Sequence, residues 1–546
     1  MNQVVNPKPG AGDVPDRAAA QESLRATVSM GKWNFYFLVK FFLFWKGMIS
    51  FHPLENLAFA AFLLLPVESA VWRKLKNVLA VLLGVALLYH DSWLPAVGRV
   101  YSQLSLLSHF DAAYLTELAG RFVNISLLAT LFIAWVVYRL IDTWVRLGLV
   151  VIGGMLVIAV SQHMPEHAIA EAGQLPQQQA AATGTPESKP DLDKVLRDFY
   201  AREATRSVSF PVPSAQEVPF DVIFIHICSL SWDDISAVGL GQHPIWKHFD
   251  FLFKHFNSAA SYSGPAAIRI ERATCGQLPN KGLFQPVAGQ CYLMGSLKRS
   301  GFEQSLALNH DGHFGGFLKE VQEQQLDIPP MPLEGVPVRE HAFDGSPVYD
   351  DFSVLSRWLE RRQKSDSPRV ALYYNTISLH DGNRLIGANA GEDSMETYRK
   401  RLSLLLDGID KFMTKLEQSG RRAVVVVIPE HGAAVRGDNM QIPGLREIPT
   451  PRITLVPVGI KVVGGGGQRQ GDTLMINDET SYLAVSQVIA NMLKNSPFDG
   501  NGYNPADYAA NLPTTQFVSQ NDTAVVMKYE GRYYWRRDGE EWSDYP

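Results

Sequence analysis

The chain has 546 residues, of which 46% are hydrophobic and 19% are charged, and its formal net charge is -5. A single hydrophobic core stops growing at roughly 250 to 300 residues, so this length predicts more than one domain. The slightly acidic balance lacks the basic footprint of a nucleic-acid-binding protein, and we expect no nucleic-acid partner.

The first 32 residues are polar and rich in Pro, Gly and Ala. They contain no apolar core and no small-residue cleavage site, so a cleavable signal peptide is not expected. This composition predicts a disordered tail. The basic residues that flank the apolar stretches after it place the tail in the cytoplasm.

The segment 33–163 is dominated by apolar stretches close to the length of about 20 residues that a helix needs to cross a bilayer. We predict a transmembrane domain of five helices; the alternative is a buried helical bundle in a soluble protein. The second and third stretches are short or closely connected. The five stretches are 33–51, 54–72, 78–93, 123–141 and 144–160.

Basic residues predict the orientation of these stretches. They precede the first stretch, follow the second, and lie between the fourth and the fifth, which places all three groups on one side of the membrane. The positive-inside rule makes that side cytoplasmic, so everything after His163 is expected on the outer side of the membrane. These residues are Arg17, Arg25, Lys32, Arg73, Lys74, Lys76, Arg139 and Arg146.

Two connecting segments have distinct compositions. Residues 101–118 place Leu, Phe and Tyr at helical spacing, which is typical of an amphipathic helix that either lies in the membrane interface or packs on the bundle. Residues 164–190 are rich in Ala, Gln, Gly and Pro without an apolar period, which predicts a flexible linker.

Residues 191–546 alternate strand and helix patterns, which predicts an α/β domain with a mostly parallel sheet and helices on both faces. The tail 514–545 carries aromatic residues around two Gly-containing turns and predicts a small antiparallel addition. Expected strands are 221–229, 305–309, 369–378, 422–428 and 453–463; expected helices are 192–206, one following Ser263, 317–325, 349–364, 394–419 and 481–494.

The strand 422–428 is a continuous Val/Ile run that leads directly into Glu430 and His431. In open α/β sheets, ligands bind at the carboxyl ends of such buried strands. Carboxylate and imidazole are common zinc ligands, so the pair is a candidate half of a metal site. The alternative is a helix-capping glutamate followed by an ordinary loop histidine.

Two further strands end on side chains with metal-binding chemistry. Cys228 ends the first strand and would bind zinc as a thiolate, although a lone cysteine is more often a small core residue. His380 follows the strand 369–378 and would bind a metal or a substrate oxygen, or remain a structural loop histidine. The coincidence of these groups at one predicted sheet edge favours a site.

Ser263 precedes Gly264 and Pro265, a sequence typical of a sharp turn into a helix. A serine at a helix N-terminus lies where backbone N–H groups favour a phosphate, and beside a metal its hydroxyl would be an activated nucleophile. The alternative is an ordinary N-cap. Arg446, in the loop after the strand 422–428, would pair with phosphate oxygens or simply be solvated.

The chain has three cysteines. Cys275 and Cys291 lie in a loop on the expected outer side of the membrane, where disulfides persist, and we predict that they form one. Cys228 is then a leftover thiol in an oxidising compartment, which a bound metal ion would protect.

These motifs together resemble the bacterial cellulose phosphoethanolamine transferase family, an inner-membrane component of cellulose secretion systems within the alkaline phosphatase and sulfatase superfamily. The resemblance extends from residue 33 onward and rests on the five apolar stretches, the linker, and the motifs around Cys228, Ser263, His380 and Glu430. The related lipid A phosphoethanolamine transferases and lipoteichoic acid synthases usually have a carboxylate and a threonine where this chain has Cys228 and Ser263.

The resemblance implies a Zn²⁺ ion held by Cys228, Glu430 and His431, with His380 close to the metal or to the transferred group. It implies Ser263 as the residue that becomes phosphoethanolaminated. It also implies phosphatidylethanolamine as donor, a glucose hydroxyl of nascent cellulose as acceptor, and cellulose synthase subunits as partners. Tyr262 beside the nucleophile and Arg446 at the phosphate complete the implied catalytic set.

Two other functions stay open on the sequence. A lipid A-type phosphoethanolamine transferase or a phosphodiesterase would keep the fold and change the acceptor. The protein could also be a non-catalytic scaffold of the cellulose secretion complex. The presence of intact candidate ligands and a candidate nucleophile argues against this function, because a scaffold would need none of them.

Overall fold

The computed structural model describes residues 30–92, 94, 112–122, 125–142, 144, 147–163, 190–214, 217–388, 394–464, 468–500 and 502–545. The expected linker 164–190, except for residue 190, and residues 1–29 of the expected N-terminal tail 1–32 lie outside these residues. Contacts divide the chain into two compact units: a helical unit, Met1–Leu94 with Val123–Pro186, and an α/β unit, Pro95–Phe122 with Glu187–Pro546. The predicted boundaries kept 95–122 with the helical part.

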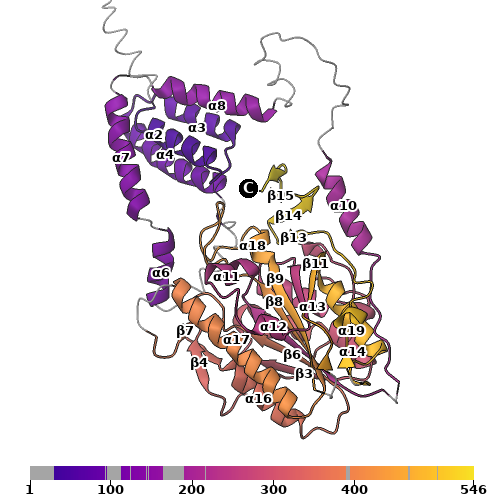
Figure 1. The fold of residues 1–546 in the computed structure, drawn as a ribbon. Coiled ribbons are helices and arrows are strands. Elements are labelled where there is room, and N and C mark those ends of the chain that lie inside the picture. Colours follow the sequence, from indigo (N-terminus) through magenta and orange to yellow (C-terminus); the bar gives the residue numbers. More distant parts are fainter. Residues whose placement is uncertain are drawn as a thin grey trace, which may run out of the picture. The chain divides into compact units, whose positions relative to one another are not determined.

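The helical unit has helices at all five apolar stretches (Figure 1). Its buried core includes Phe37, Phe59 and Met155, contributed by three different helices. None of the helices in the described part of the chain is long and apolar enough to cross a membrane. The helices are α2 (Trp33–Trp45), α3 (Pro53–Leu64), α4 (Ala70–Asp91), α7 (Ile125–Ile141) and α8 (Leu147–His163).

The expected stretch 54–72 is not one helix, which corrects the prediction. α3 ends at Leu64, and α4 begins at Ala70 and includes the stretch predicted from residue 78. Pro66 explains the break, because a proline biases the residue before it away from helical dihedral angles. Leu65 accordingly has φ -57° and ψ 123°.

The described part of the predicted amphipathic segment is α6 (Ala112–Phe122), which belongs to the α/β unit. The Tyr114 hydroxyl donates to Asp381 Oδ2 at 3.2 Å, and Glu117 pairs with Arg384. Tyr114 also packs against a cluster that includes Phe343. These contacts favour neither of the two predicted locations; residues 101–111 lie outside the described residues.

The α/β unit is built on a seven-stranded sheet of order β11-β2-β9-β8-β1-β6-β3. All strands run in one direction except β9, which is antiparallel to β2 and β8. The predicted mostly parallel sheet is confirmed. Strand bounds are β1 (Asp221–Cys228), β2 (Phe251–Asn257), β3 (Glu303–Leu308), β6 (Val370–Thr376), β8 (Ala423–His431), β9 (Leu455–Val463) and β11 (Leu474–Thr480).

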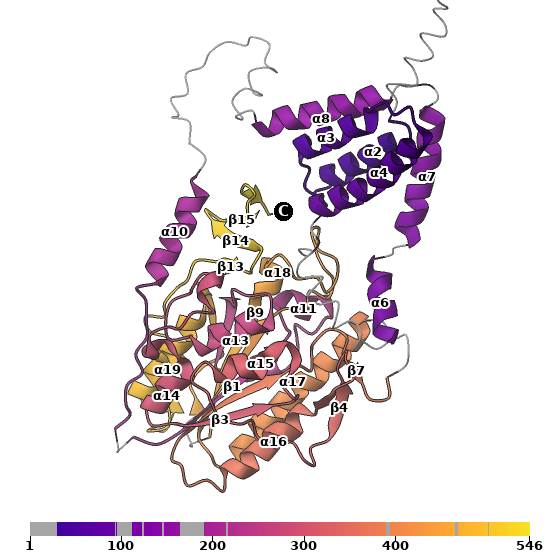
Figure 2. The same cartoon turned by 180° about the vertical axis from the view of Figure 1, so that it is seen from behind.

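Helices cover both faces of the sheet (Figures 1 and 2). Alternate residues of β1 point to opposite faces, as strand geometry requires. Phe224 packs in the core on the side of α13, α14, α15 and α19, and Ile225 packs in the core on the side of α16 and α17. Helix bounds are α13 (Ser263–Glu271), α14 (Leu293–Arg299), α15 (Phe317–Gln322), α16 (Asp351–Arg362), α17 (Ser394–Gln418) and α19 (Tyr482–Lys494).

The sequence interpretation missed β2 and β11, the two strands at one edge of the sheet. In β2, exposed His255 and half-buried Lys254 interrupt the apolar run, and in β11 only Ile476 and Thr480 are buried. Such edge strands lack the continuous apolar pattern of β8. A small sheet of β4 (Val338–His341), β5 (Pro347–Tyr349) and β7 (Arg384–Leu385) was also not predicted.

The C-terminal tail forms the predicted antiparallel addition, with strands β13 (Val518–Gln520), β14 (Ala524–Tyr529), β15 (Arg532–Arg537) and β16 (Ser543–Asp544). The helix α10 (Leu192–Glu203) packs on it through Leu192 and Phe199, which anchors the start of the segment Glu187–Pro546 to its end. The predicted disulfide between Cys275 and Cys291 is also present.

Candidate active site

The candidate site lies at the carboxyl ends of three neighbouring parallel strands. Cys228, the last residue of β1, is in register with His431, the last residue of β8. Glu430 precedes His431, and all three side chains are buried. On the other side of β1, β6 brings Asn375 to the same edge. The sheet order therefore gathers residues that are about 200 positions apart in the sequence.

Ser263 reaches this edge from the start of α13. Tyr262 is the N-cap residue, so Ser263 is the first helical residue and its hydroxyl does not serve as a cap. Its Oγ lies 3.3 Å from Cys228 Sγ and 3.4 Å from His431 Nε2. The structure thus places the serine hydroxyl between a thiol and an imidazole, not in the capping role that was the alternative.

Cys228, Glu430 and His431 form a group that could hold a metal ion, because one ligand atom from each lies within 4.8 Å of the others. Burial raises the pKa of the Cys228 thiol to about 12 and that of the Glu430 carboxyl to about 7. Among the described residues, none donates a hydrogen bond to Glu430 Oε2. A buried thiol and a buried carboxylate oxygen without a donor are groups that a divalent cation would stabilise as anions.

The hydrogen bonds of His431 suit metal binding through Nε2. Burial, together with the charge of Arg446, lowers the pKa of His431 well below its usual value, so the ring is neutral. Nδ1 lies 2.9 Å from the Gly432 carbonyl, which can only accept, so this nitrogen carries the proton and Nε2 keeps its lone pair. A ring N–H bonded to a carbonyl is the usual second contact of a metal-binding histidine.

Asn375 orients the carboxylate and was not predicted as a site residue. Its Nδ2 donates to Glu430 Oε1 at 2.7 Å, which directs Oε2 to the side where Cys228 and His431 lie. Behind it, His226 Nδ1 lies 3.7 Å from the same oxygen and 2.8 Å from the Tyr373 hydroxyl. An asparagine inside an otherwise buried strand was the available signal, because such a residue needs a polar partner.

Arg446 and Tyr262 lie beside the group. Arg446 Nη1 is 3.0 Å from His431 Nδ1, and its guanidinium lies 5.7 Å from the centre of the Tyr262 ring. A guanidinium can only donate a hydrogen bond and a carbonyl can only accept one, so Nδ1 of His431 can bond to only one of these two neighbours. We assign the hydrogen bond to the Gly432 carbonyl, with Nδ1–H as the donor. Arg446 Nη1 also lies 3.5 Å from the Ser229 hydroxyl oxygen, and a guanidinium carries further N–H groups that can bind an anion. The Tyr262 hydroxyl bonds to Glu447 at 2.5 Å.

His380 lies at the same sheet edge but has no hydrogen bond to the other candidates among the contacts of the described residues. Its Nδ1 is 2.8 Å from the Asp381 carbonyl, which assigns the proton to Nδ1 and leaves Nε2 as an acceptor. Burial lowers the pKa of His380 to about 4, so the ring is neutral. Phe343 packs 5.0 Å from it, centre to centre, and fixes its plane.

Asp234 holds the loop that follows β8. Its Oδ2 accepts from the backbone N–H of Ala433 at 2.7 Å and from the hydroxyl of Ser231 at 2.8 Å. Gly432 fits closely against both residues: a Cβ there would lie 2.6 Å from Ser231 Oγ and 2.8 Å from Asp234 Oδ2. Cβ atoms essentially never approach other atoms so closely, so there is no room for a side chain at this position and only glycine fits without displacing its neighbours.

We expect Gly432→Ala to destabilise the α/β unit by about 1 to 3 kcal/mol, the usual effect of overpacking a tight interior, and to displace the neighbouring His431. Thermal unfolding of the purified chain measures the first effect. Gly241→Ala is the matched control, since nothing lies within 4 Å of a Cβ at that position. Equal melting temperatures for the two variants would contradict the steric argument.

The fold and the site define an α/β domain that carries a serine hydroxyl beside a group of side chains that could hold a metal ion, at the carboxyl ends of its strands. Comparison with known families is more specific. The family described as "Cellulose biosynthesis protein BcsG C-terminal domain" matches residues 176–542, and the corresponding N-terminal domain matches residues 33–160. The chain belongs to this BcsG family of cellulose biosynthesis proteins, which confirms the family expected from the motifs.

Two relatives cover nearly the whole chain. The cellulose biosynthesis protein BcsG of Salmonella typhimurium is 42% identical over 542 residues, which cover 94% of this chain and 96% of that protein. The BcsG protein of Escherichia coli is 41% identical over 546 residues with the same coverage. A solved structure from Vibrio parahaemolyticus, described as a protein in the alkaline phosphatase superfamily, aligns with a TM-score of 0.47 and 16% identity, over 65% of this chain and 88% of that one.

Proposed function

We propose that the protein transfers phosphoethanolamine from phosphatidylethanolamine to glucose hydroxyls of nascent cellulose, through a covalent intermediate on Ser263. Membership in a cellulose biosynthesis family supports the acceptor. The observation that carries the chemistry is the position of the Ser263 hydroxyl, 3.3 Å from Cys228 Sγ and 3.4 Å from His431 Nε2. A hydroxyl so close to two metal-ligand atoms would contact any ion bound between them.

Cys228 Sγ, Glu430 Oε2 and His431 Nε2 would hold a Zn²⁺ ion. Thiolate, carboxylate and imidazole are the three ligand types that zinc prefers, and three protein ligands leave a position open for the reaction. When bound, zinc would lower the pKa of the Ser263 hydroxyl and stabilise negative charge on phosphoryl oxygens. Asn375 keeps the carboxylate turned toward the ion by holding its other oxygen.

Two displacements account for the transfer. In the first, a bond forms between Ser263 Oγ and phosphorus, the bond from phosphorus to the diacylglycerol oxygen breaks, and the serine proton ends on that oxygen. In the second, a glucose hydroxyl attacks phosphorus, the bond to Ser263 breaks, and the proton of that hydroxyl returns to the serine. Both steps are nucleophilic catalysis and need no oxidant or further co-reactant.

Arg446 would bind the phosphate group of the substrate, and His380 would accept a proton from the attacking hydroxyl. The guanidinium of Arg446 can donate two parallel hydrogen bonds to phosphate oxygens. The Nε2 of His380 is an acceptor, because the other nitrogen is bonded to the Asp381 carbonyl, and it can take the proton of an attacking hydroxyl. Tyr262, packed beside Arg446, would position that guanidinium.

The donor lipid also gives the helical unit a role. We place the five apolar stretches within 33–163 in the bacterial inner membrane, with 1–32 in the cytoplasm, 164–190 as a linker, and the catalytic domain 191–546, together with α6, in the periplasm. The asymmetry of basic residues supports this orientation. Tethering would raise the effective concentration of the site near phosphatidylethanolamine and near the cellulose synthase subunits.

The function is tested with the full chain in lipid nanodiscs that contain phosphatidylethanolamine labelled in the ethanolamine group, with cello-oligosaccharides as acceptor. We expect label on the oligosaccharide together with an equal amount of diacylglycerol. Release of free phosphoethanolamine instead would indicate a phosphodiesterase. In a parallel assay with lipid A as the acceptor, label on lipid A but not on the glucan would reassign the acceptor. Absence of turnover in both assays would indicate a non-catalytic scaffold.

A further inference from the structure

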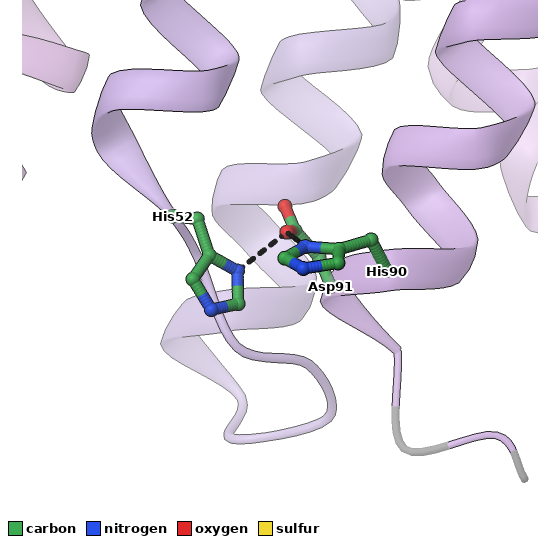
Figure 3. A group of neighbouring side chains, drawn as sticks. All are labelled: His52, His90 and Asp91. Atoms are coloured by element: carbon green, nitrogen blue, oxygen red, sulfur yellow. Dashed lines mark hydrogen bonds and ion pairs between the residues drawn. The ribbon is translucent and has the colours of Figure 1, made fainter. Parts of the chain in front are cut away.

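The helical unit contains a second cluster of metal-binding side chains, outside the candidate active site (Figure 3). It consists of His52, which is the N-cap residue of α3, and His90 and Asp91, which end α4. One ligand atom from each lies within 4.8 Å of the others. The two helix ends are held together because the backbone N–H of Ser50 donates to the Asp91 carbonyl at 2.8 Å.

Both imidazoles face the same carboxylate oxygen. Asp91 Oδ1 lies 2.8 Å from His52 Nδ1 and 3.4 Å from His90 Nδ1, and the centres of the two rings are 4.5 Å apart with an angle of 58° between their planes. Ligand atoms around a tetrahedral zinc ion, each about 2.0 to 2.2 Å from the metal, lie roughly 3.3 to 3.5 Å from one another. The separation of 3.4 Å matches this spacing, that of 2.8 Å is shorter, and the third is at most 4.8 Å, so one small divalent ion would fit after a small shift of the His52 ring.

The other oxygen of Asp91 is bound from behind. Lys40 Nζ lies 2.5 Å and Asn56 Nδ2 3.0 Å from Oδ2. The Lys40 ammonium in turn donates to Asn56 Oδ1 at 2.7 Å, and all three side chains are fully buried. Partners of this kind on a ligating carboxylate fix its orientation, and here they leave only Oδ1 facing the histidines.

The carboxylate of the cluster is buried and the two imidazoles are partly exposed, so an ion could reach them. The Asp91 side chain is fully buried, while those of His52 and His90 are 27% and 57% exposed. An ion bound here would be reached from solvent on the histidine side. A carboxylate that binds through one oxygen and two imidazoles make three ligands, which leaves a fourth tetrahedral position for water or an anionic ligand.

We propose that His52, His90 and Asp91 form a second metal site, selective for a borderline divalent ion of the Zn²⁺ or Co²⁺ kind. Two imidazoles favour these ions over Mg²⁺ and Ca²⁺, which prefer oxygen ligands. The site has no sulfur ligand, so it differs chemically from the group at Cys228. The proposal is independent of the phosphoethanolamine transfer, because no residue of the catalytic set takes part in it.

Cobalt distinguishes the two sites in the full chain in detergent micelles. Co²⁺ at the Cys228 group gives a thiolate-to-metal charge-transfer band, and Co²⁺ at the histidine cluster gives only ligand-field absorption. We expect one equivalent of Co²⁺ that binds without the thiolate band. His90→Gln and His52→Gln should weaken that equivalent at least about 10-fold, since loss of even an outer partner costs a metal site 10- to 100-fold.

The matched control is His313→Gln. His313 Nδ1 lies 3.5 Å from Asp311 Oδ2 at an exposed position, so it is a histidine–aspartate pair without a second imidazole. The substitution His313→Gln should leave Co²⁺ binding at the histidine cluster and at the Cys228 group unchanged. If His90→Gln, an exposed substitution that the fold tolerates, binds Co²⁺ like the unmodified chain, the cluster is a histidine–aspartate ion pair only and the proposal is overturned.

Discussion

Ser263→Ala is expected to abolish phosphoethanolamine transfer while leaving the fold, the metal content and membrane insertion unchanged. The hydroxyl lies within 3.4 Å of two candidate ligand atoms, Cys228 Sγ and His431 Nε2, and is not needed as a helix cap. Removal of the nucleophile from comparable catalytic sites costs on the order of 10³- to 10⁶-fold in rate. We expect a loss of at least about 10³-fold in labelled product.

A second measurement separates the covalent mechanism from direct transfer. Intact-mass spectrometry of the chain quenched during turnover should find a phosphoethanolamine adduct on the peptide that contains Ser263, and none in the alanine variant. Ser261→Ala is the matched control, because this serine is two residues away and its buried hydroxyl has no hydrogen-bond partner among the described residues. Normal modification of cellulose by Ser263→Ala would refute the assignment of the nucleophile.

The strand ends were the predictable part of the site. β8 is a continuous apolar run, and a strand buried on both faces must lie inside a sheet, so the residues that follow it lie at the edge where ligands bind. The same argument applied to β1 and β6 and identified Cys228 and the neighbourhood of His380. Local sequence was sufficient because each residue of interest directly ends or follows a strong strand pattern.

The supporting contacts could not be predicted, because they depend on the order of the strands. Asn375 contacts Glu430 only because β6 and β8 both flank β1, and no pattern within either strand specifies that neighbour. The helix α6 is a second case. Its amphipathic spacing indicated an apolar face but not the surface that the face covers, and Tyr114 in fact lies against Asp381 and Phe343 of the α/β unit.

The histidine cluster of the helical unit was missed for a related reason. His52 lies at the start of α3, and His90 at the end of α4, 38 residues later in the chain. Each is a single histidine beside an apolar stretch, which by itself indicates only a helix end. Their convergence on Asp91 follows from the packing of two antiparallel helices, whose relative register the sequence does not specify.

If the proposed zinc site is correct, Cys228→Ala is expected to remove the ion from the candidate site and to abolish the proposed transfer. Of the three candidate ligands, the cysteine alone supplies sulfur, and a carboxylate and one imidazole would remain. Since outer partners of metal ligands already contribute 10- to 100-fold to affinity, loss of a direct ligand should weaken zinc binding by at least about 100-fold. Burial raises the pKa of this thiol to about 12, so without a cation it stays protonated and unreactive.

The measurement is zinc per chain by elemental analysis after dialysis against a chelator of moderate strength, together with the thiolate band of the Co²⁺ form. The band should vanish in Cys228→Ala and persist in His90→Gln, which touches only the helical unit. Transfer activity should fall in parallel with the band, because Ser263 would keep its place but lose the ion that acidifies it. If the variant keeps full zinc occupancy and the band is absent from the unmodified chain, the cysteine is a structural thiol beside the serine, and the metal must be held without it.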